Sequence, residues 1–117
     1  MKHGLAWDAG AADAVIDRAH LDRQTDGDRA LARELLDLFA GQCRTLLPMI
    51  LDPGRPAPER ADHAHTLRGS AAAIGAVGVV PAAGAVEDAL RRGAAADEDL
   101  AALRAAVAAV LPRIGSA

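Results

Sequence analysis

The sequence predicts an all-α fold, an antiparallel four-helix bundle with a short N-terminal helix. Apolar residues recur three, four and seven positions apart in several long segments, which gives a helix one apolar face. Alanine is abundant and favours helices that approach one another closely. No strand-like alternation bounded by hairpin turns is present. Because short loops join the long segments, an antiparallel bundle is the most economical arrangement.

The length and charge of the chain fit a single domain that binds neither nucleic acid nor a membrane. The 117 residues suffice for one modest core, which we expect over residues 13–117 after a loose N-terminal arm of residues 1–12. The net charge of −3 is unlike the basic footprint of a nucleic-acid-binding protein. No apolar run approaches the roughly 20 residues of a membrane span. The first residues lack the apolar core of a secretory signal, and a lone cysteine suits a reducing compartment, so we expect a cytoplasmic protein.

The first half of the chain contains a short helix and a long one. The short helix is expected over residues 13–21. Asp28 is a plausible N-cap for a helix over residues 28–51, in which Pro48 removes an amide donor and should bend or tighten the last turn. The apolar residues of this helix lie at core-like spacing (Leu31, Leu35, Leu38, Phe39, Leu46 and Ile50).

Three further helices are expected in the second half. The central one covers residues 58–75, with Pro58 in its first turn, where the missing N–H costs little. Pro81 can open the next helix, which reaches about Arg92, with Gly93 just past its end. Asp97 caps the last helix, which should fray near Pro112 and presents regularly spaced apolar residues (Leu100, Leu103, Val107, Val110 and Leu111).

The most informative stretch lies inside the central helix. A helix advances about 100° per residue, so one of its faces is an apolar stripe suited to the core (Ala64, Leu67, Ala71 and Ile74). His65 points almost the opposite way, and its face consists of small residues and one cation (Ala61, Arg68, Gly69 and Ala72). A single imidazole therefore stands on the solvent side of the helix.

The positions of Arg68 and Gly69 on the helix give each of them a possible role beside this imidazole. Helical side chains lean toward the N-terminus, so Arg68 can bring a guanidinium near any anion attached to His65. Glycine inside a helix costs about 1 kcal/mol relative to alanine, so Gly69 needs a reason. Access of a bulky partner to the imidazole is one such reason, because a longer side chain at Gly69 would lie over the ring.

The run Ala64-His65-Thr66-Leu67-Arg68-Gly69-Ser70-Ala71 resembles the active-site motif of histidine-containing phosphotransfer (HPt) domains, H-x-L-K-G-S/A. Arg68 stands where the family usually has lysine, which keeps the charge but replaces a point ammonium by a planar fork. The resemblance covers most of residues 20–95 and continues in flanking runs (Leu35-Leu36-Asp37-Leu38-Phe39, Ile74-Gly75-Ala76, Val80 and Val86-Glu87).

The resemblance implies a phosphocarrier. We also expect a monomer, and we expect no kinase activity of its own because the sequence shows no nucleotide-binding loop. His65 would be the phosphorylated residue, and its ring nitrogen would attack a phosphoryl group in line and hold it as a phosphoramidate. Arg68 would supply charge for the transfer. The implied partners are response-regulator receiver domains and a hybrid histidine kinase. The receiver would bring the Mg²⁺, so no cofactor is expected in this chain.

Other residues have plainer interpretations beside the functional ones. Gln42 and Phe39 could border the histidine by resemblance, although Phe39 also fits ordinary core and Gln42 an ordinary surface residue. Glu87 can simply balance nearby arginines, while Arg91 and Arg92 are typical of a solvated helix end favourably placed against the helix dipole.

A metal site and a reactive thiol are not expected. His63 and His65 are two residues apart, which on a helix turns them about 200° from each other, so they cannot chelate one ion. His63 falls near the edge of the apolar stripe and is interpreted as structural. Cys43 lacks a nearby positive helix terminus and should be inert.

Two other functions remain open from the sequence. One is the phosphoacceptor region of a sensor histidine kinase, in which an acidic residue follows the histidine and a proline comes five positions after it. Thr66 and Ser70 occupy those places here, and no ATP-binding domain follows. The other is a helical scaffold that binds a partner through the Ala/Gly face without phosphorylation. The joint presence of His65, Arg68 and Gly69 argues against that reading.

Overall fold

The structure is a computed structural model that describes residues 15–115, a range that contains five helices and no strand. The helices are α2 Arg18–Gln24, α3 Arg29–Leu51, α4 Ala57–Ile74, α5 Val79–Arg91 and α6 Asp97–Gly115. The all-helical prediction is therefore confirmed. The predicted arm of residues 1–12 lies outside the described residues.

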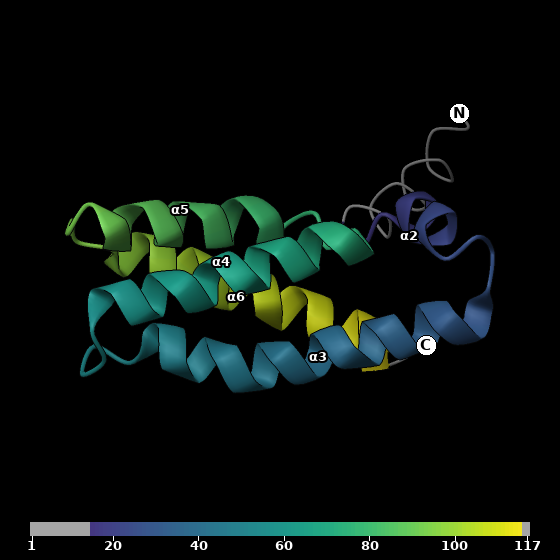
Figure 1. The fold of residues 1–117 in the computed structure, drawn as a ribbon, viewed down its shortest axis with the longest axis horizontal. Coiled ribbons are helices and arrows are strands. Elements are labelled where there is room, and N and C mark those ends of the chain that lie inside the picture. The colour runs from purple at the N-terminus through teal and green to yellow at the C-terminus, as the bar shows by residue number, and fades with distance from the viewer. Residues whose placement is uncertain (1–14, 116–117) are drawn as a thin grey trace, which may run out of the picture.

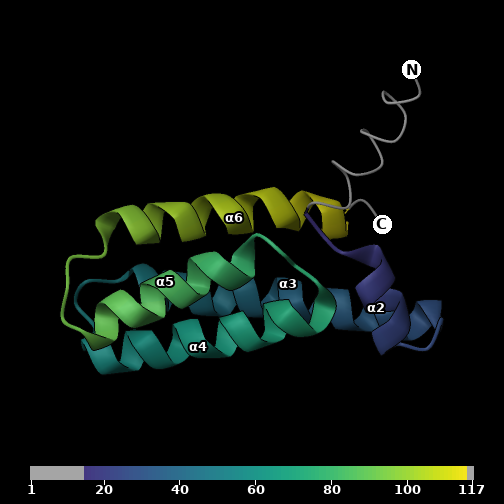
Figure 2. The same ribbon diagram turned by 90° about the horizontal axis from the view of Figure 1, so that it is seen from above.

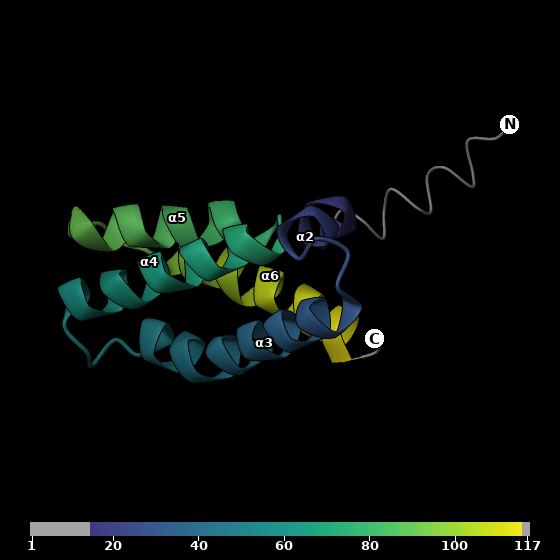
Figure 3. The ribbon, with the colours of Figure 1, turned by 45° about the vertical axis from the view of Figure 1, so that its right-hand side comes forward.

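The four longer helices lie lengthwise beside one another, and the chain reverses direction at each connection between them (Figure 1). Helix α4 packs against both α3 and α5, and α6 packs against α5 and α3, so that the four surround a common core. Seen from above, α5 lies between α4 and α6 (Figure 2). The short α2 crosses the end of the bundle and contacts α4 and α3 (Figure 3).

The apolar stripe predicted for α4 faces the core. Ala64, Leu67 and Ala71 have no exposed surface, and Ile74 is 4% exposed. Ala64 and Ala71 have small side chains, which lets α3 and α5 approach α4 closely. Larger side chains from the other helices and from the segment before α2 fill the rest of the core. The largest fully buried ones are Phe39, Ile50, Leu103 and Ile114 in the helices and Ile16 before α2.

The short N-terminal helix was predicted over residues 13–21, but residues 15–17 are not helical and α2 begins at Arg18. Residues 13 and 14 lie outside the described residues. Asp17 is the N-cap of α2, because the Asp17 carboxylate accepts the His20 N–H at 3.0 Å. The residues just before it run against the end of α4, where the Asp17 N–H donates to the Gly75 carbonyl at 2.7 Å. Gly75 ends α4 in the left-handed conformation, and a Cβ there would lie 2.8 Å from the Asp17 carbonyl oxygen, so this position requires glycine.

The start of α3 is confirmed, since Asp28 caps it by accepting the Leu31 N–H at 3.0 Å. Helix α5 begins at Val79, two residues before the predicted Pro81. Pro81 fits inside its first turn because amides there have no partner within the helix. Asp97 is the first residue of α6 rather than its cap.

The predicted fraying near Pro112 is wrong. Helix α6 continues to Gly115, and Ile114, beyond the proline, is 2% exposed. Burying an isoleucine side chain contributes about 1.5–3 kcal/mol, which offsets most of the cost of an interior proline. Core packing therefore stabilises the helix beyond Pro112, although the helix propensity of proline predicts an end there.

Candidate functional site

His65 projects from the exposed side of α4 and meets a carboxylate from α5. Its side chain is 60% exposed, and its Nδ1 atom lies 3.2 and 3.1 Å from Oε1 and Oε2 of Glu87. Glu87 follows His65 by 22 residues in the chain. Small buried side chains on both helices, such as Ala64 and Ala83, let α4 and α5 come close enough for this contact.

The Glu87 carboxylate is shared among three basic side chains. Arg91 donates its Nε–H to Oε2 at 3.1 Å, Arg68 Nη2 lies 3.5 Å from Oε1, and the third neighbour is His65. The Glu87 side chain is only 10% exposed. Burial raises its pKa, but the hydrogen bonds from Arg91 and His65 and the charges of His65 and Arg68 outweigh it, so the pKa lies below the usual glutamate value. Glu87 is therefore a carboxylate at neutral pH.

This network selects one tautomer of His65. A carboxylate only accepts hydrogen bonds, so the Nδ1 atom that faces both oxygens carries the hydrogen and donates it to Glu87. Arg68 Nη2 is also 3.3 Å from Nδ1, but a guanidinium only donates and finds its acceptor in Glu87. In this tautomer the lone pair is on Nε2. Within residues 15–115, no side chain or backbone group forms a hydrogen bond with Nε2.

Arg68 lies at the edge of the imidazole ring, on the side that its helical position predicts. Its guanidinium bridges His65 on its own helix and Glu87 on α5. The aliphatic part of the side chain passes over Gly84 of α5, since a Cβ at Gly84 would lie 3.4 Å from Arg68 Cδ. The arrangement fixes a permanent positive charge next to the ring.

A second ion pair ties this network back to α4. Arg91 Nη2 donates to Oδ1 of Asp62 at 3.0 Å while its Nε binds Glu87. The expectation that Arg91 belongs to a solvated helix end is therefore incomplete, because its side chain links Asp62 to Glu87 and orients the carboxylate. Sequence reasoning treated Glu87 only as a charge balance for arginines and did not consider Asp62. The one local signal available was the four-residue spacing of Glu87 and Arg91, which suits a helical ion pair.

The surface around His65 is open on the side of Gly69. Gly69 is exposed, and a Cβ at this position would have no heavy atom within 4 Å outside its neighbours and its own helix backbone. Ala72 is exposed one turn further on. The prediction that Ala61 belongs to this surface is wrong, because Ala61 has no exposed area. The methyl group of Ala61 is too short to reach the surface at a place where the longer imidazole of His65 does.

Gln42 lies at a different place, in a shallow hollow between α3 and α4. It is half-buried and lines this hollow together with Leu38 and Thr66. His65 does not line it, and leans toward α5 instead. Phe39 is 2% exposed and belongs to the core, in agreement with its plainer interpretation.

The remaining candidates have structural roles. His63 points toward Glu59, with its Nε2 atom 3.7 Å from Oε2, away from the Glu87 network. Burial raises the pKa of the Cys43 thiol to about 11 against the opposing charge of Arg44, so the thiol is a poor nucleophile. Among residues 15–115 there is no group of three or more potential metal ligands. In the same range, no helix is long and apolar enough to cross a membrane.

Comparison with known proteins identifies the family of the chain. A family model described as the Hpt domain matches residues 34–112, which is more than half of the chain and includes His65, Arg68 and Glu87. Comparisons with curated proteins and with solved structures gave no match.

Proposed function

Since the chain belongs to the Hpt domain family, the phosphotransfer modules of two-component systems, we propose that it carries a phosphoryl group on Nε2 of His65 between aspartates of receiver domains. The observation that supports this most directly is the Nδ1 contact with Glu87, which leaves Nε2 with the lone pair on an exposed side chain. A nucleophile with this geometry can be reached by a partner protein.

The transfer is a displacement at phosphorus. The Nε2 lone pair attacks the phosphorus of a receiver aspartyl phosphate, the P–O bond to the aspartate breaks, and the carboxylate leaves with the bonding electrons. The product is a phosphoramidate on an imidazole that has gained positive charge. Glu87 stabilises that charge through the Nδ1–H, and the same step in reverse passes the group to a second receiver.

Arg68 and Arg91 support this chemistry in different ways. Arg68 is beside the ring, so its guanidinium is available to the oxygens of the incoming phosphoryl group. Arg91 is a positioning residue, because it holds the Glu87 carboxylate while itself bound to Asp62. Phosphoryl transfer depends mainly on positioning and charge, and both are present here.

The partner supplies what this chain lacks. A receiver domain would bring the Mg²⁺ and the acidic groups that hold it, and a hybrid histidine kinase would provide the phosphoryl group upstream. We propose that the receiver docks over Gly69 and Ala72 and reaches the hollow with Gln42, where Leu38 is 62% exposed. The chain itself would act as a cytoplasmic monomer, an antiparallel four-helix bundle without kinase activity.

Incubation with a purified phospho-receiver tests this function. Radiolabel should move from the receiver to the chain in the presence of Mg²⁺, and His65→Gln should accept none while keeping its helical content. ATP alone should not label the chain. Labelling from ATP, or labelling that persists in His65→Gln, would contradict the proposal.

A further inference from the structure

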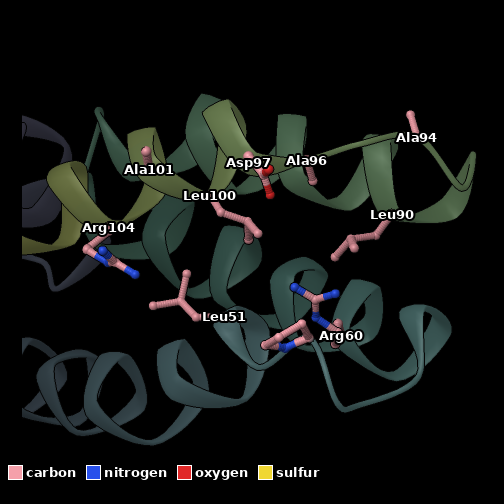
Figure 4. A pocket seen from close by; sticks show the side chains of 10 residues that line it. Leu51, Arg60, Leu90, Ala94, Ala96, Asp97, Leu100, Ala101 and Arg104 are labelled. Atoms are coloured by element: carbon pink, nitrogen blue, oxygen red, sulfur yellow. The ribbon is translucent and has the colours of Figure 1, made fainter.

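A feature that the phosphotransfer site does not explain lies at the end of the bundle opposite α2. A cavity of about 360 Å³ opens there, where the α3–α4 connection meets the start of α6 (Figure 4). Its lining is contributed by all four long helices and their connections (Leu51, Pro53, Arg60, Leu90, Ala94, Ala96, Asp97, Leu100, Ala101 and Arg104). Arg60 and His65 lie on the same helix, but their five-residue separation turns them about 140° apart. The cavity is therefore on a different side of α4 from the imidazole.

A buried arginine points into this cavity. Arg60 is 9% exposed, and its Nε–H donates to the Ile50 carbonyl at 2.8 Å, in the last turn of α3. That bond satisfies a carbonyl that has no partner within its own helix. The two terminal guanidinium nitrogens are not used in this bond and are directed into the space between Leu51, Leu90 and Leu100 (Figure 4).

The charges in the cavity do not balance. Arg104 of α6 also lines it, and within residues 15–115 neither Arg60 nor Arg104 forms an ion pair with a carboxylate. Asp97 is the one acidic residue of the lining, and it is exposed at the start of α6. Two guanidinium groups thus face one carboxylate. The unused guanidinium nitrogens are therefore free to donate to an anion that enters the cavity.

We propose that this cavity binds a small organic anion with an oxyanion head and an aliphatic body. The head, a carboxylate or a phosphate, contacts the terminal nitrogens of Arg60, whose fork geometry matches such groups, and Arg104 adds positive charge from the α6 side of the lining. The body packs against Leu51, Leu90 and Leu100. A site of this size and mixed lining is in the range of small-molecule pockets. The site is separate from His65 and does not depend on the phosphotransfer role.

The contrary reading is that Arg60 only caps α3 and leaves its charge to water. Titration of the ¹⁵N-labelled chain with hexanoate, at constant ionic strength, separates the two. Hexanoate should shift the amide signals of residues near the cavity, such as Leu90 and Leu100, in a saturable way. Hexanamide, which has the same body without charge, and inorganic phosphate, which has charge without the body, should each bind about tenfold more weakly.

Substitutions identify the groups that bind. Arg104→Gln should weaken hexanoate binding about tenfold without loss of folding, since Arg104 is exposed, and Arg44→Gln, on the exposed side of α3, should leave binding unchanged. Arg60→Lys keeps the charge and should retain weak binding. Absence of saturable shifts, equal binding of hexanamide, or equal affinity in Arg104→Gln would overturn the proposal. Phosphate that binds as tightly as hexanoate would refute the apolar half of the site.

Discussion

Replacement of Gly69 separates the access role of this residue from a packing role. Gly69 is inside α4, has ordinary helical geometry and leaves open space where a Cβ would be. Gly69→Ala should therefore raise the unfolding free energy by about 1 kcal/mol, because alanine is the better helix former and meets no neighbour. For a domain of this size that corresponds to a rise in thermal midpoint of about 4 °C.

The length of the new side chain should then decide the transfer rate. Gly69→Ala should still transfer, since a methyl group does not reach over the ring. Gly69→Gln should fold as well as Gly69→Ala but accept phosphate at least about tenfold more slowly, because the partner's aspartyl phosphate can no longer reach Nε2 in line.

The assay pairs thermal unfolding with the rate of phosphate transfer from a receiver, measured per folded molecule. Gly41→Ala is the stability control, because Gly41 is also in a helix interior with open space at its Cβ. It should be stabilised by about the same amount. The access role would be refuted if Gly69→Ala lowered the unfolding free energy. It would also be refuted if Gly69→Gln transferred phosphate at the rate of the unmodified chain.

Four further outcomes follow from the contacts around His65 and from the core. Glu87→Gln should slow transfer about five- to tenfold through loss of the charged acceptor at Nδ1. The pKa of Glu87 is lowered in the folded chain, so the stabilising effect of its charge is fully present above the unfolded pKa of about 4.3 and is lost as the pH falls through the lower, folded pKa. Urea unfolding should therefore show a stability difference between the chain and Glu87→Gln at pH 7, and this difference should shrink as the pH is lowered below about 4.3. Arg91→Gln should slow transfer less than Glu87→Gln, with little change in thermal midpoint, because the exposed Arg91 orients the carboxylate and does not touch the imidazole; equal losses in the two variants would contradict this ranking. Cys43, with a pKa near 11, should react with a thiol reagent at pH 8 about 100-fold more slowly in the folded than in the urea-unfolded chain, and equal rates would contradict its burial.

Features that depend on one helix were predictable from the sequence. The core stripe of α4, the lean of Arg68 toward His65 and the N-cap at Asp28 all follow from helical spacing and local hydrogen bonding. The open space beside Gly69 was also predicted from the position of this residue on the helix. The first three depend on spacings of three or four residues along one helix, where helix geometry fixes the outcome.

Features that depend on how two helices meet were not predictable in this way. The partner of His65 is Glu87, whose position against α4 is set by the connection after Gly75 and by packing of α4 on α5. Ala61 shares a helical face with His65, yet the packing of the helices leaves Ala61 with no exposed area. The continuation of α6 beyond Pro112 likewise depends on the burial of residues in the core, which helix propensity does not take into account.

The central claim is that Nε2 of His65 is the phosphorylated atom, and ³¹P NMR of the chain after transfer from a phospho-receiver tests it most directly. We expect one phosphohistidine signal with the shift of the Nε2 isomer, absent in His65→Gln, lost in mild acid and retained in base. A signal of the Nδ1 isomer would contradict the tautomer assigned by Glu87. Phosphate on another residue, or no phosphohistidine with any receiver, would contradict the phosphotransfer function itself.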